Sequence, residues 1–357
     1  MKNPKVNVDI KKVIANAKEV VNLAAEKGIE VVGVTKSVCA NLEVAKALLK
    51  GGVVGLADSR INNLLYLREN LKLERVPLML LRTPMLSEVE QVVKYVDVSL
   101  NSELKIVKAL NEVAREQELL HKVILMVDVG DRREGVMPDN VMKIVEEVLQ
   151  LTNIKLVGIG TNLACFGGVL PSDENMKVLI ELREKINEEF DENLKIISGG
   201  NSSSLPRLKE RGLPPEINQL RVGETILLGR NVTNREPFPN TFQDSFLLEA
   251  EIIELKEKPA QSEGRIGQNA FGEKEISSKK GIRKRAILAV GRQDVFFKGL
   301  TPLDKGVKIE SASSDHLIVD LTGYRKDTTI GDSLKFELNY AALLRAMTSP
   351  YVKVDYN

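Results

Sequence analysis

The chain has 357 residues, and its 51 basic and 50 acidic side chains leave a formal net charge of +1, which favours neither nucleic acid nor an anionic membrane. It contains no apolar run of membrane-spanning length and no apolar leader segment at its N-terminus. Two cysteines and two histidines, all widely separated, argue against a disulfide scaffold and offer no metal-ligand spacing, so we expect a soluble, globular, cytoplasmic protein without a metal.

Apolar, strand-like runs alternate with helical patterns from the start of the chain to about residue 228. The candidate strands are residues 30–35, 53–57, 77–81, 96–100, 123–127, 154–159, 195–197 and 217–221. The candidate helices include residues 10–27, a segment from residue 41, 102–117, 139–151 and 172–190, the last with Ser172 as its N-cap. Eight strands alternating with helices predict an α/β fold, a (β/α)₈ TIM barrel. A doubly wound sheet is the alternative, but no Gly-x-Gly-x-x-Gly follows the first strand.

The sequence pattern changes after Leu228. A segment rich in prolines and polar residues is followed by runs in which apolar and polar residues alternate, without long helical patterns. These runs are residues 246–255, 284–290, 317–321 and 333–338. They predict a smaller β-rich domain, so we expect a barrel at 1–229 and a C-terminal β domain at 230–357. The polar, glycine-containing stretch 256–284 predicts a long hairpin or a mobile loop.

A single lysine stands where the first predicted strand ends, in the run Val31-Val32-Gly33-Val34-Thr35-Lys36. The carboxyl ends of strands are where α/β folds build active sites. An amine held there and partly desolvated can form a Schiff base with an aldehyde. Taken alone, however, Lys36 more often signals a side chain that snorkels from a strand end.

Further segments follow later strands of the predicted barrel: residues 127–135, 160–168, 198–204 and 220–224. The last two have the small and hydroxylated residues of a phosphate cup, and barrels commonly bind phosphate after strands seven and eight. A lysine facing a phosphate cup suggests pyridoxal phosphate, which carries both an aldehyde and a phosphate. By itself the run Gly199-Gly200-Asn201-Ser202 more often forms an ordinary tight turn and helix cap.

Two longer phrases resemble a known family. They are Thr161-Asn162-Leu163-Ala164-Cys165-Phe166-Gly167-Gly168 and Ile197-Ser198-Gly199-Gly200-Asn201-Ser202-Ser203-Ser204. With them, nearly the whole chain resembles the fold-type III pyridoxal-phosphate enzymes of the alanine racemase kind, and among these the ornithine racemases. The resemblance implies a barrel followed by a β domain, pyridoxal 5'-phosphate as cofactor, and a homodimer in which the β domain completes the partner's site.

The resemblance also implies roles for individual residues. Lys36 matches the Schiff-base lysine, and Arg133, in the pattern Asp128 to Gly135, matches an arginine near the cofactor's phenolic oxygen. Asn162 stands where alanine racemases place a histidine against the ring, and Arg221 matches the arginine at the pyridine nitrogen. Ser202 and Tyr340 match phosphate-binding side chains, while Gly223 and Glu224 match backbone contacts to the phosphate.

The chain departs from the alanine racemase pattern at its second base. Arg292 stands at the position of the tyrosine supplied by the partner subunit, Ala40 replaces another tyrosine, and Met126 replaces a lysine of some members. Candidates for the second base or for substrate contact are Cys165, Asp294, Asp315 and His316, together with Arg292 at the substrate side.

The resemblance implies an amino-acid racemase that interconverts L- and D-ornithine by two-base proton transfer, with Lys36 as one base. Ornithine carries a distal ammonium that needs an acceptor, and we favour Asp315 over Asp294 for this role. Alanine, lysine or another amino acid are alternative substrates, and decarboxylase chemistry is an alternative reaction. A non-catalytic pyridoxal-phosphate-binding protein is a further alternative, which the C-terminal domain disfavours because the single-domain relatives lack it.

Overall fold

A computed structural model describes residues 4–71, 76–274 and 280–357 of the chain. The chain divides into two compact units. Residues Ile10–Phe242 form the first unit, and Gln243–Asn357 form the second together with residues 4–9. Each unit has its own sheet and its own buried apolar residues.

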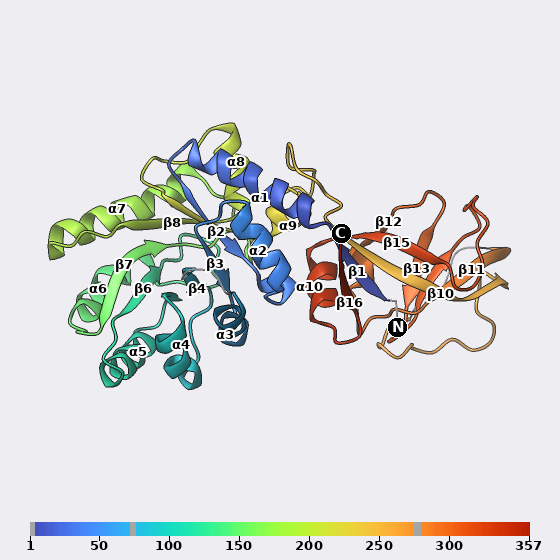
Figure 1. The fold of residues 1–357 in the computed structure, drawn as a ribbon, viewed down its shortest axis with the longest axis horizontal. Helices are drawn as coiled ribbons and strands as arrows, with labels where there is room; N and C mark the ends of the chain where they lie inside the picture. Colours follow the sequence, from blue (N-terminus) through green and yellow to red (C-terminus); the bar gives the residue numbers. More distant parts are fainter. Residues whose placement is uncertain (1–3, 72–75, 275–279) are drawn as a thin grey trace. The chain divides into compact units, whose positions relative to one another are not determined.

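The first unit is a closed barrel of eight parallel strands within the described residues (Figure 1), which confirms the predicted fold class. Its strands, in barrel order, are β2 (Glu30–Val34), β3 (Gly55–Asp58), β4 (Leu78–Leu80), β5 (Val98–Asn101), β6 (His121–Met126), β7 (Ile154–Gly160), β8 (Ile196–Asn201) and β9 (Gln219–Val222). All eight predicted strands are present, with ends shifted by a few residues. The barrel closes where β9 pairs with β2, placing Val222 beside Gly33.

Helices connect successive strands on the outside of this barrel (Figure 1). They are α1 (Ile10–Ala25), α2 (Leu42–Lys50), α3 (Ile61–Asn70), α4 (Val89–Tyr95), α5 (Leu104–Glu116), α6 (Val141–Leu149), α7 (Asp173–Phe190), α8 (Leu205–Glu210) and α9 (Glu224–Leu228). Ser172 is the N-cap of α7, as predicted. Its side chain accepts from the Asn175 backbone amide, and the Asn175 side chain accepts from the Ser172 backbone amide. Among the described residues, no helix combines the length and the apolar character needed to cross a membrane.

The barrel interior is apolar on one side and polar on the other. Strands β2 to β6 contribute one buried apolar cluster, made of Val32, Val34, Ala57, Met79, Leu100, Ile124 and Met126. On β8 and β9, by contrast, the Ser198 hydroxyl donates to Gln219 Oε1 at 3.0 Å, and the buried Arg221 lies beside them. Buried polar groups need partners, and Ser198, Gln219 and Arg221 form one such group of mutually satisfied side chains on β8 and β9.

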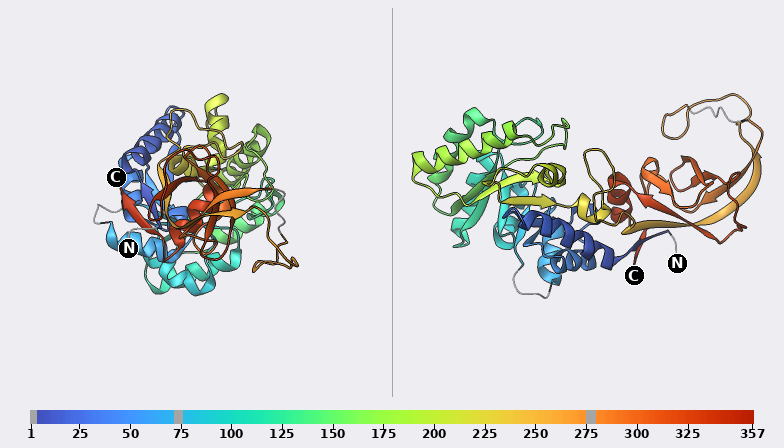
Figure 2. Two further views of the ribbon diagram at one scale, coloured as in Figure 1. Left: turned by 90° about the vertical axis from the view of Figure 1, so that its right-hand side faces the viewer. Right: turned by 90° about the horizontal axis from the view of Figure 1, so that it is seen from above.

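The second unit is a mostly antiparallel sheet with one helix. In the order of their pairing, its main strands are β12 (Leu300–Pro302), β15 (Ser333–Leu338), β10 (Phe246–Pro259), β11 (Ile282–Leu288), β14 (Leu317–Asp320) and β13 (Lys308–Ala312). Two further strands, β1 (Lys5–Val8) and β16 (Lys353–Tyr356), pair with each other, and β1 also pairs with β10. The unit also contains helix α10 (Tyr340–Thr348). Strands β10 and β11 form the expected long hairpin, and their far ends extend beyond the other strands (Figure 2). Within the predicted stretch 256–284, residues 275–279 lie outside the described residues.

The structure divides the chain at places that differ from the expected boundary after residue 229. Strand β1 pairs antiparallel with β10 and parallel with β16, so the start of the chain belongs to the β unit. At the other boundary, the amide of Phe238 donates to the carbonyl of Gly229, and the amide of Phe242 donates to Asn16 in α1. These bonds tie residues 230–242 to the barrel. Strands β1, β12, β13 and β16 and helix α10 were not expected from the sequence pattern.

His121 is a buried ionisable group at the start of β6. Its Nε2 lies 2.8 Å from the Ser99 hydroxyl, which also accepts from the Asn101 amide. Burial lowers the pKa of His121 from its ordinary value of 6.5 to about 4, and the nearby Asp97 opposes the change only in part. The native protein therefore holds this imidazole neutral at pH values where the unfolded chain protonates it.

We expect the free energy of unfolding to fall by roughly 3 kcal/mol on this account between pH 6.5 and pH 4. Above pH 6.5 the imidazole is neutral in both states. As the pH falls toward 4, only the unfolded chain takes up the proton, and stability is lost. Urea unfolding at pH 7, 5.5 and 4 checks this against His121→Gln, which keeps a polar side chain near Ser99 but does not titrate. Equal acid sensitivity of the two proteins would contradict the expectation.

Candidate active site at the mouth of the barrel

The carboxyl ends of β2, β9 and β8 are neighbours, and three of the predicted site segments meet there. Lys36 begins a 3₁₀ turn (Lys36–Val38) directly after β2. Arg221 lies on β9, where it pairs with Asn201 of β8, and Ser202 begins a second 3₁₀ turn after β8. Residues separated by more than 160 positions in sequence are therefore gathered at one end of the barrel because a closed parallel sheet brings all strand ends together.

The half-buried Lys36 stands on a well-supported turn. The preceding hydroxyl, on Thr35, donates to the Asp58 carboxylate at 2.8 Å, and the Thr35 amide donates to the carbonyl of Ala57. Burial raises the pKa of Asp58, although hydrogen bonds from Thr35 and Asn63 oppose this effect. The strand end that presents the lysine is thus anchored to β3 by a buried carboxylate.

Arg221 is only 3% exposed, and its guanidinium spans the interior of β7, β8 and β9. Nη2 donates to the Thr161 carbonyl at 2.6 Å and to Asn162 Oδ1 at 2.8 Å, while Nη1 donates to the Ser198 hydroxyl. Desolvation lowers the pKa of Arg221 to about 10. The group therefore remains a cation at neutral pH, with its nitrogen atoms held by partners from two other strands.

The turn after β8 and the turn after β9 contact each other through Ser202. The hydroxyl of this buried serine accepts from the Thr225 amide at 3.4 Å. Gly223 is needed at this point because a Cβ there would lie 3.0 Å from the Cβ of Val34 and would push β9 away from β2. The arrangement leaves a hydroxyl and the start of α9 side by side, the donor set expected of a phosphate cup.

The Glu224 side chain follows Gly223, next to this cup, and its negative charge is balanced by a neighbouring arginine. It forms an ion pair with Arg235. Burial raises the pKa of Glu224, and the charges of Arg235 and, to a smaller extent, Lys36 oppose the change. The last effect places the Lys36 ammonium close enough to Glu224 to matter electrostatically.

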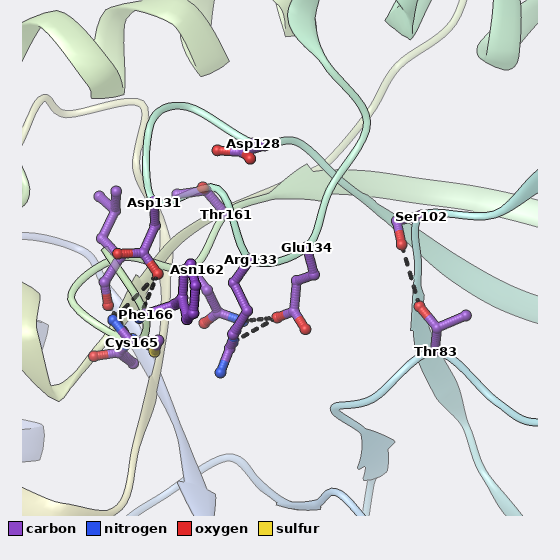
Figure 3. A network of polar contacts seen from close by, with 12 residues as sticks. Thr83, Ser102, Asp128, Asp131, Arg133, Glu134, Thr161, Asn162, Cys165 and Phe166 are labelled. Carbon is purple, nitrogen blue, oxygen red and sulfur yellow. Dashed lines mark hydrogen bonds and ion pairs between the residues drawn. The ribbon is translucent and has the colours of Figure 1, made fainter. Parts of the chain in front are cut away.

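Arg133 and Asn162 lie on different loops and share one carboxylate (Figure 3). Glu134 Oε1 accepts from Arg133 Nη2 at 2.7 Å and from Asn162 Nδ2 at 2.5 Å. Because Asn162 Oδ1 accepts from Arg221, a continuous chain of contacts runs from the exposed Arg133 to the buried arginine.

Cys165 lies in the loop after β7, which another carboxylate organises (Figure 3). Asp131 Oδ2 accepts from the amides of Cys165 and Phe166, and its Oδ1 accepts from Val169. The thiol of Cys165 is exposed and lies 3.4 Å from the Asn201 side-chain nitrogen. Among the described residues, no group of three or more His, Cys, Asp or Glu side chains is arranged to hold a metal ion.

In the second unit, the Arg292 side chain is surrounded by contacts with other residues of the same unit. Its guanidinium carbon lies 4.1 Å from the ring centroid of Phe271 and 5.0 Å from that of Phe297. It pairs with Glu273 at 2.6 Å and donates to the Ala312 carbonyl at 2.7 Å. The hydrogen bond from Arg292 holds the pKa of Glu273 down at about 2. Arg292 therefore holds residues 271–273 against the sheet.

The remaining candidates of the second unit differ in accessibility. Asp294 is buried, accepting from the Gly291 amide at 3.1 Å and from the Ser349 hydroxyl at 3.0 Å, so it stabilises its own turn. Asp315 is exposed and His316 is half-buried, and Asp315 Oδ1 lies 2.9 Å from His316 Nδ1. Tyr340 is half-buried in the first turn of α10, after the N-cap Asn339.

Sequence reasoning overlooked three residues that organise the mouth: Asp131, Glu134 and Thr225. Asp131 and Glu134 lie inside the motif from Asp128 to Gly135, in which only Arg133 was predicted to have a role. Their signal was present, since acidic side chains in a loop rich in arginine need partners. Thr225 contributes a backbone amide, which no side-chain pattern reveals.

Comparisons with known proteins identify the family of this chain and its fold. Residues 8–231 match the family model described as "Alanine racemase, N-terminal domain". The chain is 43% identical to the lysine racemase of Thermotoga maritima over 353 residues, which cover 99% of this chain and 98% of that protein. It is 45% identical to the ornithine racemase of Acetoanaerobium sticklandii over 353 residues, 99% of both chains.

Solved structures share the fold at lower identity. The alanine racemase of Clostridium difficile 630 superimposes with a TM-score of 0.75 at 22% identity, covering 100% of this chain and 96% of that one. The alanine racemase of a Streptomyces lavendulae strain that produces D-cycloserine gives a TM-score of 0.76 at 16% identity, covering 100% and 97%. These structures establish a barrel followed by a β-rich unit as a known architecture.

We expect Asp131→Asn to loosen the loop after β7. The loss of the charge that accepts three backbone amides should lower the free energy of unfolding by roughly 2–3 kcal/mol. Amide hydrogen exchange at residues 165, 166 and 169 should speed up more than exchange in β7. The exposed Asp139→Asn serves as the matched control. Unchanged exchange in the loop would show that its conformation does not depend on Asp131.

Proposed function

The chain belongs to the alanine racemase family, and on this premise we propose that it interconverts L- and D-ornithine. It is a pyridoxal 5'-phosphate-dependent amino-acid racemase, an isomerase, since relatives over its full length are racemases. The substrate is the proposed part. It is supported by the similarity to an ornithine racemase, and the similarity to a lysine racemase favours lysine as the second candidate.

The residues at the mouth fit this cofactor. Lys36 offers an amine at a strand end, and the buried Ser202 hydroxyl, whose oxygen accepts from the Thr225 amide, keeps its own hydrogen to donate to a phosphate. Arg221 offers a fixed cation between them in the barrel order. When bound, pyridoxal phosphate supplies the aldehyde that takes up an amine and the conjugated ring that stabilises the electron pair left at the α-carbon.

We assign each residue a role on this basis. Lys36 would hold the cofactor and would act as the acid–base group on one face of the α-carbon. Arg133, Asn162 and Arg221 would contact the ring. Ser202 and the backbone of Gly223 and Glu224 would hold the phosphate, and the family match gives Tyr340 of the second unit the same role.

Arg221 has a specific chemical consequence. It remains protonated at neutral pH, so it cannot accept a proton from a ring nitrogen, and its charge disfavours protonation of that nitrogen. A neutral ring withdraws electrons less strongly than a charged one. This limits the side reaction in which the amino group is transferred and favours returning the proton to the α-carbon.

The second acid–base group is assigned among the accessible candidates. Asp294 and Arg292 are engaged in contacts within their own unit, and an arginine is a poor base. Cys165 and Asp315 are exposed, and the half-buried His316 keeps 42% of its side chain accessible. We favour His316, because an imidazole oriented by a carboxylate is a common general base, while the free Asp315 oxygen can accept a distal ammonium.

We also propose that the chain works as a homodimer. Five large apolar side chains are exposed on segments that follow β4, β6 and β7: Met85, Leu86, Met137, Phe166 and Leu170, of which Phe166 is 75% exposed. Apolar side chains gathered at one end of a barrel support a contact with a second copy.

Lys36→Ala should lower the racemisation rate of ornithine by at least about a thousandfold, because it removes both the cofactor's attachment point and one base. Chiral chromatography after incubation with L-ornithine and pyridoxal phosphate measures the rate. Lys46→Ala, which removes an exposed lysine paired with Glu43 on α2, is the control and should retain full activity. A folded Lys36→Ala protein with wild-type activity would end this proposal.

Asp315→Asn should raise the Michaelis constant for ornithine by about tenfold or more, while that for an uncharged amino acid changes little. The reason is the loss of the charge that pairs with the distal ammonium. Asp304→Asn, which removes a carboxylate from another ion pair in the same unit, is the matched control. Equal losses on charged and uncharged substrates would assign Asp315 a role in catalysis or structure instead.

A further inference from the structure

Glu134 is the carboxylate on which two loops of the mouth converge. Its Oε1 atom accepts from Arg133 Nη2 at 2.7 Å and from Asn162 Nδ2 (Figure 3). The other end of the Asn162 amide accepts from Arg221 Nη2 at 2.8 Å. The two guanidinium groups are thus joined through three side-chain contacts and one shared carboxylate oxygen.

The loop that carries Glu134 is held by several contacts of its own backbone. Asp128 Oδ1 accepts from the amides of Gly130 and Arg132, and Val136 forms a bridge to Val127. Gly135 has φ +124°, and a Cβ there would lie 2.4 Å from the Asp128 amide. Only glycine allows this close approach, and it fixes the residue directly before it.

The charges along this chain alternate. Burial disfavours the Arg221 cation, the Glu134 carboxylate stabilises it, and the Arg133 cation opposes that stabilisation. Without the carboxylate, two guanidinium groups would lie near one another with no anion between them. Glu134 itself is part-exposed, with 30% of its side chain accessible, so it is reachable from the mouth.

We propose that Glu134 is a positioning residue that holds Arg133 directly and Arg221 through Asn162, so that both arginines meet the cofactor in fixed orientations. This inference rests on the proposed function, since it assumes that pyridoxal phosphate binds at this mouth. It extends that proposal by adding a residue that touches neither cofactor nor substrate.

Charge and orientation predict opposite effects when Glu134 is neutralised. Removal of a negative charge by itself would tighten the binding of an anionic ligand such as pyridoxal phosphate. Loss of the oriented arginines would weaken it, because their donors would no longer point at the ligand. The sign of the change in affinity therefore separates the two roles.

The experiment titrates pyridoxal phosphate into cofactor-free protein and records the dissociation constant and the visible circular dichroism of the bound cofactor. Glu134→Gln should raise the dissociation constant by about tenfold and reduce the dichroism by at least about half. Glu134→Asp should behave similarly, since the shorter side chain cannot reach both Arg133 and Asn162. Glu147→Gln, which removes a carboxylate from an exposed ion pair between α5 and α6, should match the wild type.

A double-mutant cycle completes the test. Arg133→Gln alone should also weaken binding by about tenfold, and the double variant should be no weaker than either single one, because both remove the same oriented contact. Tighter or unchanged binding by Glu134→Gln, or effects that multiply in the double variant, would overturn the inference alone. A wild-type protein that binds no pyridoxal phosphate would overturn the proposed function and this inference together.

Discussion

A buried cation organises the functional end of the barrel. Arg221 is removed from water, and an unpartnered guanidinium in that position would be strongly destabilising. It is instead satisfied by the Thr161 carbonyl, the Asn162 side chain and the Ser198 hydroxyl. These partners come from β8 and from the segment after β7. One side chain on β9 therefore requires polar partners from the adjacent strand β8 and from the segment that follows β7.

The same requirement explains why the barrel interior is divided. Strands β2 to β6 fill their side with aliphatic residues, which stabilise the barrel without needing partners. The polar contacts of Arg221 lie on β8, on β9 and after β7, while Asp58 on β3 and Ser99 on β5 belong to separate buried polar contacts. Lys36 stands between the two regions, because β2 contributes Val32 and Val34 to the apolar cluster and also pairs with β9. An amine at this boundary is partly desolvated yet close to polar neighbours.

The loops at the mouth are held by carboxylates rather than by apolar packing. Asp58 anchors the strand end before Lys36, and Asp131 gathers the amides after β7. Glu134 joins the loop after β6 to the loop after β7. Charge-assisted hydrogen bonds are short and directional, so these loops are ordered while remaining polar enough to face a charged ligand. Arg292 fulfils a comparable role in the second unit, where it is sandwiched between two phenylalanine rings.

The sequence by itself determined the fold class and which strand-end segments lie at the mouth of the barrel. Alternating apolar and helical periods follow from local geometry, so the eight barrel strands and the cap at Ser172 were readable in order. Lys36 was singled out because strand ends of a parallel barrel meet at one end, whereas the roles of Ser202 and Arg221 came from the family resemblance. Short strands such as β1 and β16 were not readable, since their four residues carry too little periodicity and their pairing partners are distant.

Only the tertiary structure decided which polar residues act together. Nothing in the segment around Arg292 reveals that two rings and Glu273 enclose it, or that Asp294 is buried in its own turn. The link from Glu134 through Asn162 to Arg221 likewise joins loops separated by 28 and 59 residues. Hydrogen bonds of this kind form or fail when the donor–acceptor distance changes by a fraction of an ångström. Packing of the whole barrel sets these distances, and no local sequence pattern encodes them.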